Sequence, residues 1–144
     1  MTKEKWIKKQ PFAEKIAIIA GGSKGIGKAT AKEIVKLGGS VCIIARNVDT
    51  LKEAVKEIEN LKVSANQFVE MISCDTSNME KLKPLLTEFI QKHRAPDYLI
   101  NIVGYAYPEY IENLKLEDFK KNMDINYYGQ LVPILIILPY FMEA

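Results

Sequence analysis

Three closely spaced glycines, Gly21, Gly25 and Gly27, are the residues of this chain best suited to hold a ligand. They follow the apolar run 15–20, which has the composition of a buried strand, and they open a stretch with helical periodicity. At such a junction the first N–H groups of the helix have no partner and can bind a pyrophosphate, whereas side chains in the turn would block its approach. An ordinary glycine turn is the alternative, but the strand before it and the helix after it favour a phosphate cradle.

The next apolar run, 40–45, ends at the position that distinguishes the two nicotinamide cofactors. Sites for NAD place an acidic side chain there, about 20 residues after the glycines, to bind the ribose 2′-hydroxyl. This chain has Ala45 followed by Arg46, and Lys24 adds a second cation inside the glycine turn. A guanidinium can bind a 2′-phosphate through two hydrogen bonds. Both cations could instead be ordinary solvated residues, but their positions favour NADP(H) as the cofactor.

Other reactive side chains are few. The single His93 cannot form a metal site alone, and no Cys-x-x-Cys pair is present, so we expect no metal. Cys42 and Cys74 both lie in apolar runs, where two buried, reduced thiols are expected.

The elements that must position these residues alternate along the chain. Runs rich in β-branched and apolar residues occupy 15–20, 40–45, 67–74 and 98–103, and stretches with helical periodicity begin near residues 25, 51, 79 and 116. This alternation predicts an α/β fold, a Rossmann-like doubly wound parallel sheet of about four strands in the order 3-2-1-4. The usual sheet continues beyond its fourth strand. We therefore expect residues 1–144 to form a single NADP(H)-binding domain that is truncated at its C-terminus.

Composition excludes several functional classes. With 48% hydrophobic residues, a formal net charge of +2 and no basic cluster mixed with aromatics, a nucleic-acid partner is not expected. The N-terminal stretch 1–12 lacks the apolar segment of a secretory signal. The longest apolar run, 131–142, is shorter than the roughly 20 residues that span a bilayer, so we expect no transmembrane segment and a cytoplasmic location.

These residues resemble the short-chain dehydrogenase/reductase family. The run GGSKGIG at 21–27 is similar to the family's T-G-x-x-x-G-I-G fingerprint, and NIVG at 101–104 is similar to its N-N-A-G motif. Asp75, followed by Thr76, stands where the family binds the adenine amino group, and Asn126 matches a helix asparagine that supports the proton relay. The resemblance implies these cofactor contacts: Gly21, Ser23, Lys24, Gly25, Ile26, Gly27, Arg46, Asp75, Thr76, Asn101, Val103 and Gly104.

The chain also departs from the family pattern. Ala20 replaces a threonine that braces the glycine turn, and Ile102 and Val103 replace the second asparagine and the alanine of the N-N-A-G motif. Thr50 stands where the most similar branch would place a lysine. The family's catalytic Tyr-x-x-x-Lys pair is not found, because none of the seven tyrosines is followed by a lysine four residues later.

Within the family, the runs GGSKGIGKA, IIARN and MDINYYG are similar to reductases that act on long-chain keto lipids of sphingolipid synthesis. The resemblance implies that the parent protein is an NADPH-dependent carbonyl reductase with a small-molecule substrate, and that this chain is its cofactor-binding half. A non-catalytic dinucleotide-binding module or an inactive fragment is the alternative. The resemblance also implies a homo-oligomer formed through the C-terminal helix, and it adds the cytosolic face of the endoplasmic reticulum as a second candidate location.

Overall fold

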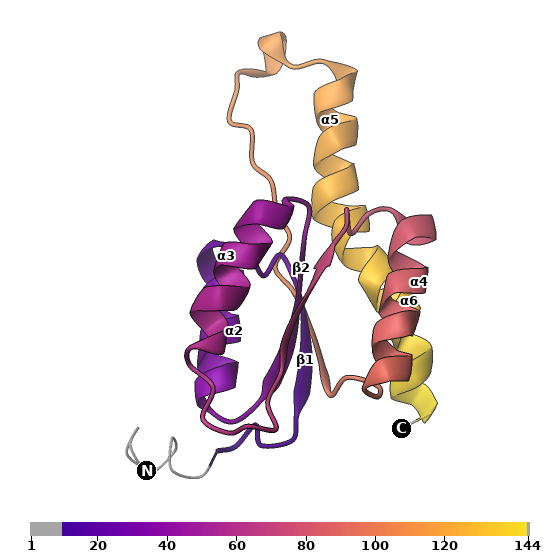
Figure 1. Ribbon diagram of the computed structural model, residues 1–144. Coiled ribbons are helices and arrows are strands. Elements are labelled where there is room, and N and C mark those ends of the chain that lie inside the picture. Colours follow the sequence, from indigo (N-terminus) through magenta and orange to yellow (C-terminus); the bar gives the residue numbers. More distant parts are fainter. Residues whose placement is uncertain (1–9, 144) are drawn as a thin grey trace.

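A parallel sheet of four strands, in the order β3-β2-β1-β4, forms the centre of the protein (Figure 1). The computed structural model describes residues 10–143, so most of the N-terminal stretch in which no secretory signal is expected lies outside the described residues. The strand order and the parallel pairing confirm the predicted fold class. The elements are β1 (Ile16–Ala20), α2 (Gly25–Lys36), β2 (Ser40–Ala45), α3 (Val48–Glu59), β3 (Val69–Ser73), α4 (Met79–Lys92), β4 (Tyr98–Asn101), η1 (Ile111–Asn113), α5 (Leu116–Met123), η2 (Asp124–Tyr128) and α6 (Gly129–Glu143).

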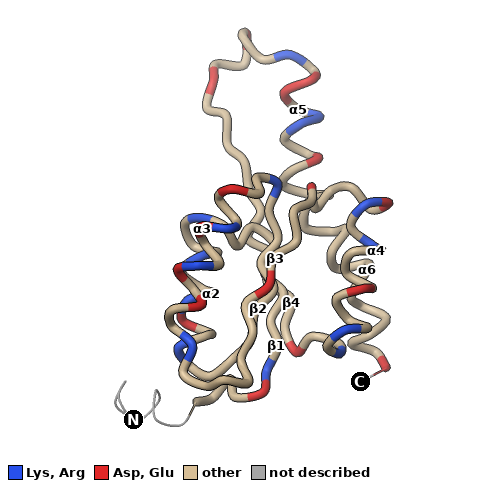
Figure 2. The backbone as a smooth tube through the Cα atoms, viewed as in Figure 1, with Lys and Arg blue, Asp and Glu red and all other residues tan. Residues whose placement is uncertain are grey.

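Helices cover both faces of the sheet, because successive strand residues point to opposite sides. In β1, Ala17 and Ile19 pack against α2 and α3, whereas Ile16 and Ile18 pack on the side of α4 and α6. Figure 1 shows α2 and α3 on one side of the sheet and α4 and α6 on the other. The strands carry almost no charge, as the tube in Figure 2 shows, and the one charged strand residue is Glu70 of β3. Burial works against the charged form of Glu70, but hydrogen bonds from Lys92 and His93 lower the pKa of its carboxyl.

Residues at the helix ends fix where each helix begins and stops. The side chain of Asn47 accepts a hydrogen bond from the N–H of Thr50 and caps α3. At the end of α2, Gly38 adopts φ +94°, and its N–H donates to the carbonyl of Val35. The chain can therefore reverse at once into β2.

The third strand, β3, is shorter than the predicted run 67–74, because the side chain of Gln67 binds backbone groups of two other segments. Its side chain is 5% exposed, and its amide Nε2 donates to the carbonyls of Val35 and Gly39 at 2.7 Å each. Its Oε1 accepts from the N–H groups of Val63 and Ser64. A buried polar side chain is stable only when such partners are present. Gln67 therefore ties the α3–β3 loop to the end of α2, and β3 starts after it.

The C-terminal helical segment begins at Leu116, as predicted, and extends to Glu143. α5 continues through a π-helical turn, η2, into α6, where Val132, Ile136 and Ile137 are buried. By length and composition alone, Leu116–Glu143 is long and apolar enough to cross a membrane, the one helix of residues 10–143 for which this holds. The expectation of no transmembrane segment, based on the run 131–142, is therefore not supported. The core helix of a soluble protein meets the same criteria.

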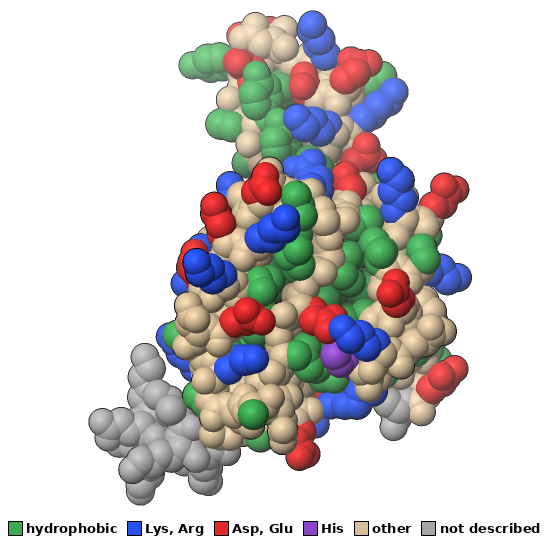
Figure 3. Space-filling model, viewed as in Figure 1, with side chains coloured by type: hydrophobic (Ala, Val, Ile, Leu, Met, Phe, Trp, Pro, Cys, Tyr) green, Lys and Arg blue, Asp and Glu red, His purple; other side chains and the backbone are tan. Residues whose placement is uncertain are grey.

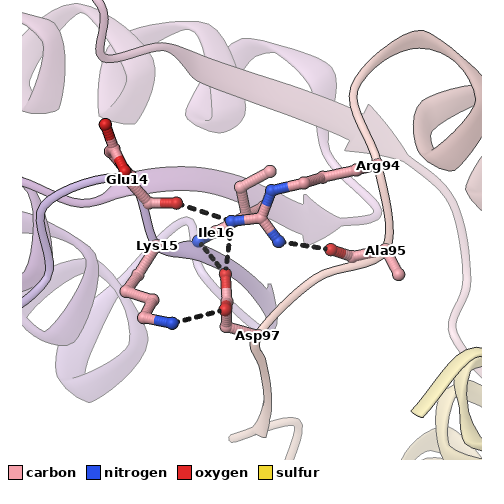
Figure 4. A network of polar contacts seen from close by, with 6 residues as sticks. All are labelled: Glu14, Lys15, Ile16, Arg94, Ala95 and Asp97. Carbon is pink, nitrogen blue, oxygen red and sulfur yellow. Dashed lines mark hydrogen bonds and ion pairs between the residues drawn. The ribbon is translucent and has the colours of Figure 1, made fainter. Parts of the chain in front are cut away.

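Asp97 joins the starts of β1 and β4, at the edge of the sheet opposite the glycine turn (Figure 4). Its carboxylate accepts hydrogen bonds from the N–H of Ile16 at 2.9 Å, from Lys15 Nζ at 2.9 Å and from Arg94 at 2.7 Å. Arg94 also donates to the carbonyls of Glu14 and Ala95. Burial alone would raise the pKa of Asp97, but these donors outweigh it and hold the pKa below its ordinary value.

We expect the substitution Asp97→Asn to lower the free energy of unfolding by about 1–2 kcal/mol at pH 7, because it removes the charge that these donors stabilise. The pKa of the Asp97 carboxyl is lower in the folded protein than in the unfolded chain, where it is about 3.9. The ionised carboxylate therefore stabilises the fold fully above the unfolded pKa, and this contribution is lost as the pH falls through the folded pKa. The difference between wild type and variant should therefore shrink below about pH 4. Urea unfolding between pH 3 and pH 7 measures it, with Glu53→Gln on the surface of α3 as the control. A difference that does not change with pH would contradict this account.

Candidate functional site

A cleft of about 420 Å³ lies at the carboxyl ends of the strands, where nucleotides bind to open α/β sheets. It runs from the ends of β2 and β3, past the glycine turn that follows β1, to the segment that follows β4. Its walls are formed by Gly21, Ser23, Lys24, Gly25, Ile44, Ala45, Arg46, Asn47, Thr50, Cys74, Asp75, Thr76, Ile102, Val103, Gly104 and Ile125.

The glycine turn has a geometry that only glycine allows. Gly21 adopts φ +90°, and a Cβ placed there would lie 2.9 Å from the carbonyl carbon of Ile102. A Cβ on Gly27 would lie 2.1 Å from the carbonyl oxygen of Gly21, so α2 starts as close to the turn as its backbone permits. Gly25 adopts φ +51°, and a Cβ there would meet no protein atom within 4 Å. Gly25 therefore leaves open space beside the N-terminus of α2, of the kind that a phosphate group needs.

Two cations lie at this cleft, one in the turn and one at the end of β2. Lys24 and Arg46 are both exposed wall residues, and among the described residues no ion pair involves either side chain. The other arginine, Arg94, is bound in the Asp97 network at the opposite end of the strands. Arg46 is thus available to an anionic ligand. Ala45 leaves no carboxylate at this position to repel one.

Asp75 and Cys74 form the wall beside Arg46, at the end of β3. Asp75 Oδ1 accepts hydrogen bonds from the N–H of Ser77 at 3.0 Å and from its hydroxyl at 2.8 Å. These bonds hold one carboxylate oxygen of Asp75. Burial first, and then the Asp75 carboxylate, raise the pKa of the Cys74 thiol. Cys74 therefore contributes a neutral wall at physiological pH and not a nucleophile.

The far end of the cleft is more apolar. Val103 and Gly104 follow β4, and Ile125 belongs to η2. Thr76, 4% exposed, lies in the same cleft. The two ends of the cleft thus differ: the β2–β3 end carries charge, and the β4 end is lined mainly by aliphatic side chains.

Four of the residues singled out from the sequence do not line the cleft. Ile26 is 74% exposed on α2, and Gly27 is buried where the helix meets the turn. Asn101 belongs to β4, and its Oδ1 is buried without a hydrogen-bond partner among the described residues. Asn126 is engaged with the backbone of Tyr105, to which it both donates and accepts a hydrogen bond. These four residues can shape the cleft but do not form its wall.

Sequence reasoning missed several wall residues. Asn47 was not singled out as a site residue, and Thr50 was noted only as a departure from the family. Ile44, Cys74 and Ile125 had no signal beyond their apolar character. Ile44 and Cys74 lie at the carboxyl ends of β2 and β3, which meet at one edge of the sheet. Asn47 and Thr50 reach the cleft from the start of α3, and Ile125 reaches it from η2.

Comparison with known protein families assigns residues 15–144 to the model described as short chain dehydrogenase. The chain is 33% identical over 127 residues to the 3-ketodihydrosphingosine reductase of Bos taurus, a match that covers 88% of this chain and 38% of the bovine protein. It is 31% identical over 138 residues to the protein of the same name from Dictyostelium discoideum, covering 88% of this chain and 41% of that protein. The chain thus spans about two fifths of the length of these relatives.

Solved structures share the fold. A short chain dehydrogenase from Bacillus anthracis superposes with a TM-score of 0.83 at 27% identity and covers 92% of this chain and 51% of that one. A 3-oxoacyl-[acyl-carrier protein] reductase with bound NAD from Brucella melitensis superposes with a TM-score of 0.85 at 21% identity, covering 100% of this chain and 55% of that one. The shared part is the half of those chains that corresponds to β1 through α6.

Proposed function

Because the chain belongs to the short-chain dehydrogenase family, we propose that its cleft binds NADP(H) and that the protein reduces a carbonyl compound with it. A nicotinamide dinucleotide is supported by the family and by the cleft at the carboxyl ends of the strands. The phosphorylated form is favoured by one observation above all. Arg46, whose guanidinium has no ion pair within residues 10–143, lies at the end of β2, where an NAD site would carry an acid.

The proposed placement follows the two ends of the cleft. The diphosphate would lie against the N-terminus of α2, where Gly25 leaves space and the Lys24 side chain makes no capping hydrogen bond to the first N–H groups of the helix. The adenosine half would lie toward Asp75 and Arg46, with the 2′-phosphate bound by the Arg46 guanidinium and attracted by Lys24. The nicotinamide half would then occupy the apolar end, beside Val103, Gly104 and Ile125.

In this arrangement the cofactor supplies a hydride, and the residues of this chain bind and orient it. Arg46 and Lys24 would hold the anionic end of the cofactor, and the aliphatic wall at the β4 end would lie against its nicotinamide half. Asn126 fixes the backbone that follows β4 by its two hydrogen bonds to Tyr105. No residue of this chain is assigned as the proton donor, since none of its tyrosines precedes a lysine by four residues.

The relatives favour a long-chain keto lipid as the substrate. Relatives from Bos taurus, Mus musculus and Dictyostelium discoideum, each matched over 88% of this chain, are named 3-ketodihydrosphingosine reductase. We propose that the protein acts on a ketone of this class, in the cytoplasm or at the cytosolic face of the endoplasmic reticulum.

The proposal is tested by titrating the intact protein with NADPH and with NADH in a calorimeter. A charged hydrogen bond of about 1.5–3 kcal/mol to the 2′-phosphate predicts that NADPH binds roughly 10- to 100-fold more tightly. Equal affinities for NADPH and NADH would contradict the proposed 2′-phosphate contact but not the dinucleotide site itself. Binding of neither cofactor would refute the proposal as a whole.

We also propose that the exposed face of α6 is covered by a second copy of the protein. Ile134, Leu135 and Leu138 are each 41–50% exposed, although neighbouring residues on the same helix are buried. Apolar side chains also gather on the projecting segment formed by residues 104–123, as Figure 3 shows. Exposed apolar side chains gathered on one helix are typical of interfaces.

The substitution Leu138→Glu should therefore shift the protein toward monomers, because it buries a charge in the interface. Sedimentation velocity measures the change, and Leu85→Glu, on the outer face of α4, is the matched control. A wild-type protein that sediments as a monomer at tens of micromolar would exclude this interface.

A further inference from the structure

The segment after β4 leaves the sheet just where it forms the cleft wall. The last ladder hydrogen bond of this strand runs from the N–H of Ile102 to the carbonyl of Ala20, at 2.8 Å. Val103 and Gly104 come next, and both line the cleft. From Val103 onward the backbone needs partners other than a neighbouring strand.

Side chains of the C-terminal helical segment supply those partners. Gln130 Nε2 donates to the carbonyl oxygen of Val103 at 3.1 Å. One turn earlier, Asn126 accepts from the N–H of Tyr105 at 2.8 Å and donates to its carbonyl at 2.7 Å. Residues four apart lie on the same side of a helix. The two amides therefore bind alternate residues of one extended segment.

The helix approaches this segment as closely as a glycine allows. A Cβ placed on Gly129 would lie 3.2 Å from Thr76 Oγ1 and 3.3 Å from Val103 Cγ1. Gly129 also closes the π-helical turn, since its N–H reaches the carbonyl of Asp124. Gln130, the next residue, is half-buried and reaches the Val103 carbonyl from this position.

We propose that Gln130 is a positioning residue, which fixes the Val103 carbonyl and thereby shapes the end of the cleft that receives the nicotinamide half of the cofactor. The inference rests on the proposed function, because it takes the cofactor to run from Arg46 to Val103. Gln130 acts through the backbone of Val103 and not by contact with the adenosine half, which lies at the other end of the cleft. Its loss should therefore affect the two halves of the cofactor differently.

The test compares NADPH with adenosine 2′,5′-bisphosphate, which carries the adenosine half and the 2′-phosphate but no nicotinamide. In the intact protein, Gln130→Met keeps the length of the side chain and removes the donor. We expect it to weaken NADPH about fivefold, as for one hydrogen bond, and to change the bisphosphate less than twofold. Gln91→Met, on the exposed end of α4, should change neither ligand.

A second variant, Gln130→Glu, adds a readout that a purely structural role would not produce. At neutral pH its carboxylate would face the Val103 carbonyl without a proton to donate, whereas the protonated form can donate one. The loss of NADP⁺ affinity relative to wild type should therefore shrink as the pH is lowered from 7 toward the carboxyl pKa, about 4.3 for an unperturbed glutamate. Equal loss of both ligands in Gln130→Met, or no loss of NADPH, would overturn the role of Gln130. Failure of the wild type to bind either ligand would instead refute the proposed function.

Discussion

Replacing Arg46 with alanine is expected to weaken NADPH binding by about 10- to 100-fold and to leave NADH binding nearly unchanged. The reason is the position of this guanidinium, which lines the cleft at the end of β2 and has no ion pair among residues 10–143. Among the described residues no carboxylate competes for this guanidinium, so it is available to bind a 2′-phosphate. NADH lacks that phosphate, so removing Arg46 should not weaken its binding.

Two further variants make the experiment specific. Arg46→Lys keeps the charge but loses the bidentate geometry, so we expect an NADPH affinity between those of wild type and Arg46→Ala. Lys62→Ala removes a cation beyond the end of α3 that lies away from the cleft, and it should bind both cofactors as the wild type does. Equal losses for NADPH and NADH in Arg46→Ala would contradict the assignment of the 2′-phosphate to Arg46.

The substitution Gly27→Ala should have the largest effect on stability. Its Cβ would lie 2.1 Å from the carbonyl oxygen of Gly21, a backbone atom that cannot move without opening the turn. We expect a loss of about 3 kcal/mol in the free energy of unfolding, because overpacking against backbone cannot relax through a side-chain rotation. Cofactor binding should be lost with it, since the same displacement moves the N-terminus of α2.

Gly104→Ala is the matched control for this experiment. A Cβ there would meet only Asn126 Oδ1, at 3.6 Å, which is an ordinary contact. Its free energy of unfolding should stay within about 0.5 kcal/mol of the wild type. Thermal or urea unfolding measures both variants. A Gly27→Ala protein as stable as Gly104→Ala would show that the turn is not as constrained as its geometry indicates.

The fold could be predicted from the sequence because its signals are local and agree with one another. The alternation of apolar runs with helical periodicity determines the parallel sheet, and Asn47 and Gly38 mark a helix start and a helix end by their own chemistry. The glycine turn and Arg46 could be identified as candidate cofactor contacts for the same reason, because each lies directly beside a strand and a helix that the sequence predicts.

Features that depend on contacts distant in sequence could not be predicted in the same way. Gln67 looks like the first residue of a strand, and only the fold shows that it binds the carbonyls of Val35 and Gly39. Gln130 has no sequence signal at all, because its partner Val103 lies 27 residues earlier. The membrane-span criterion was applied to the apolar run 131–142 alone, although the predicted helix began near Leu116. Polar residues of α5 interrupt the apolar pattern but not the helical backbone, so the whole segment Leu116–Glu143 meets that criterion by length and composition.

The most direct test of the central claim is a crystal structure of the intact protein with NADP⁺ bound. The account predicts the diphosphate against the N-terminus of α2, beside Gly25, and the 2′-phosphate about 3 Å from the guanidinium nitrogens of Arg46. It also predicts the nicotinamide beside Val103. A cofactor that lay outside this cleft, or whose 2′-phosphate pointed away from Arg46 into solvent, would contradict it.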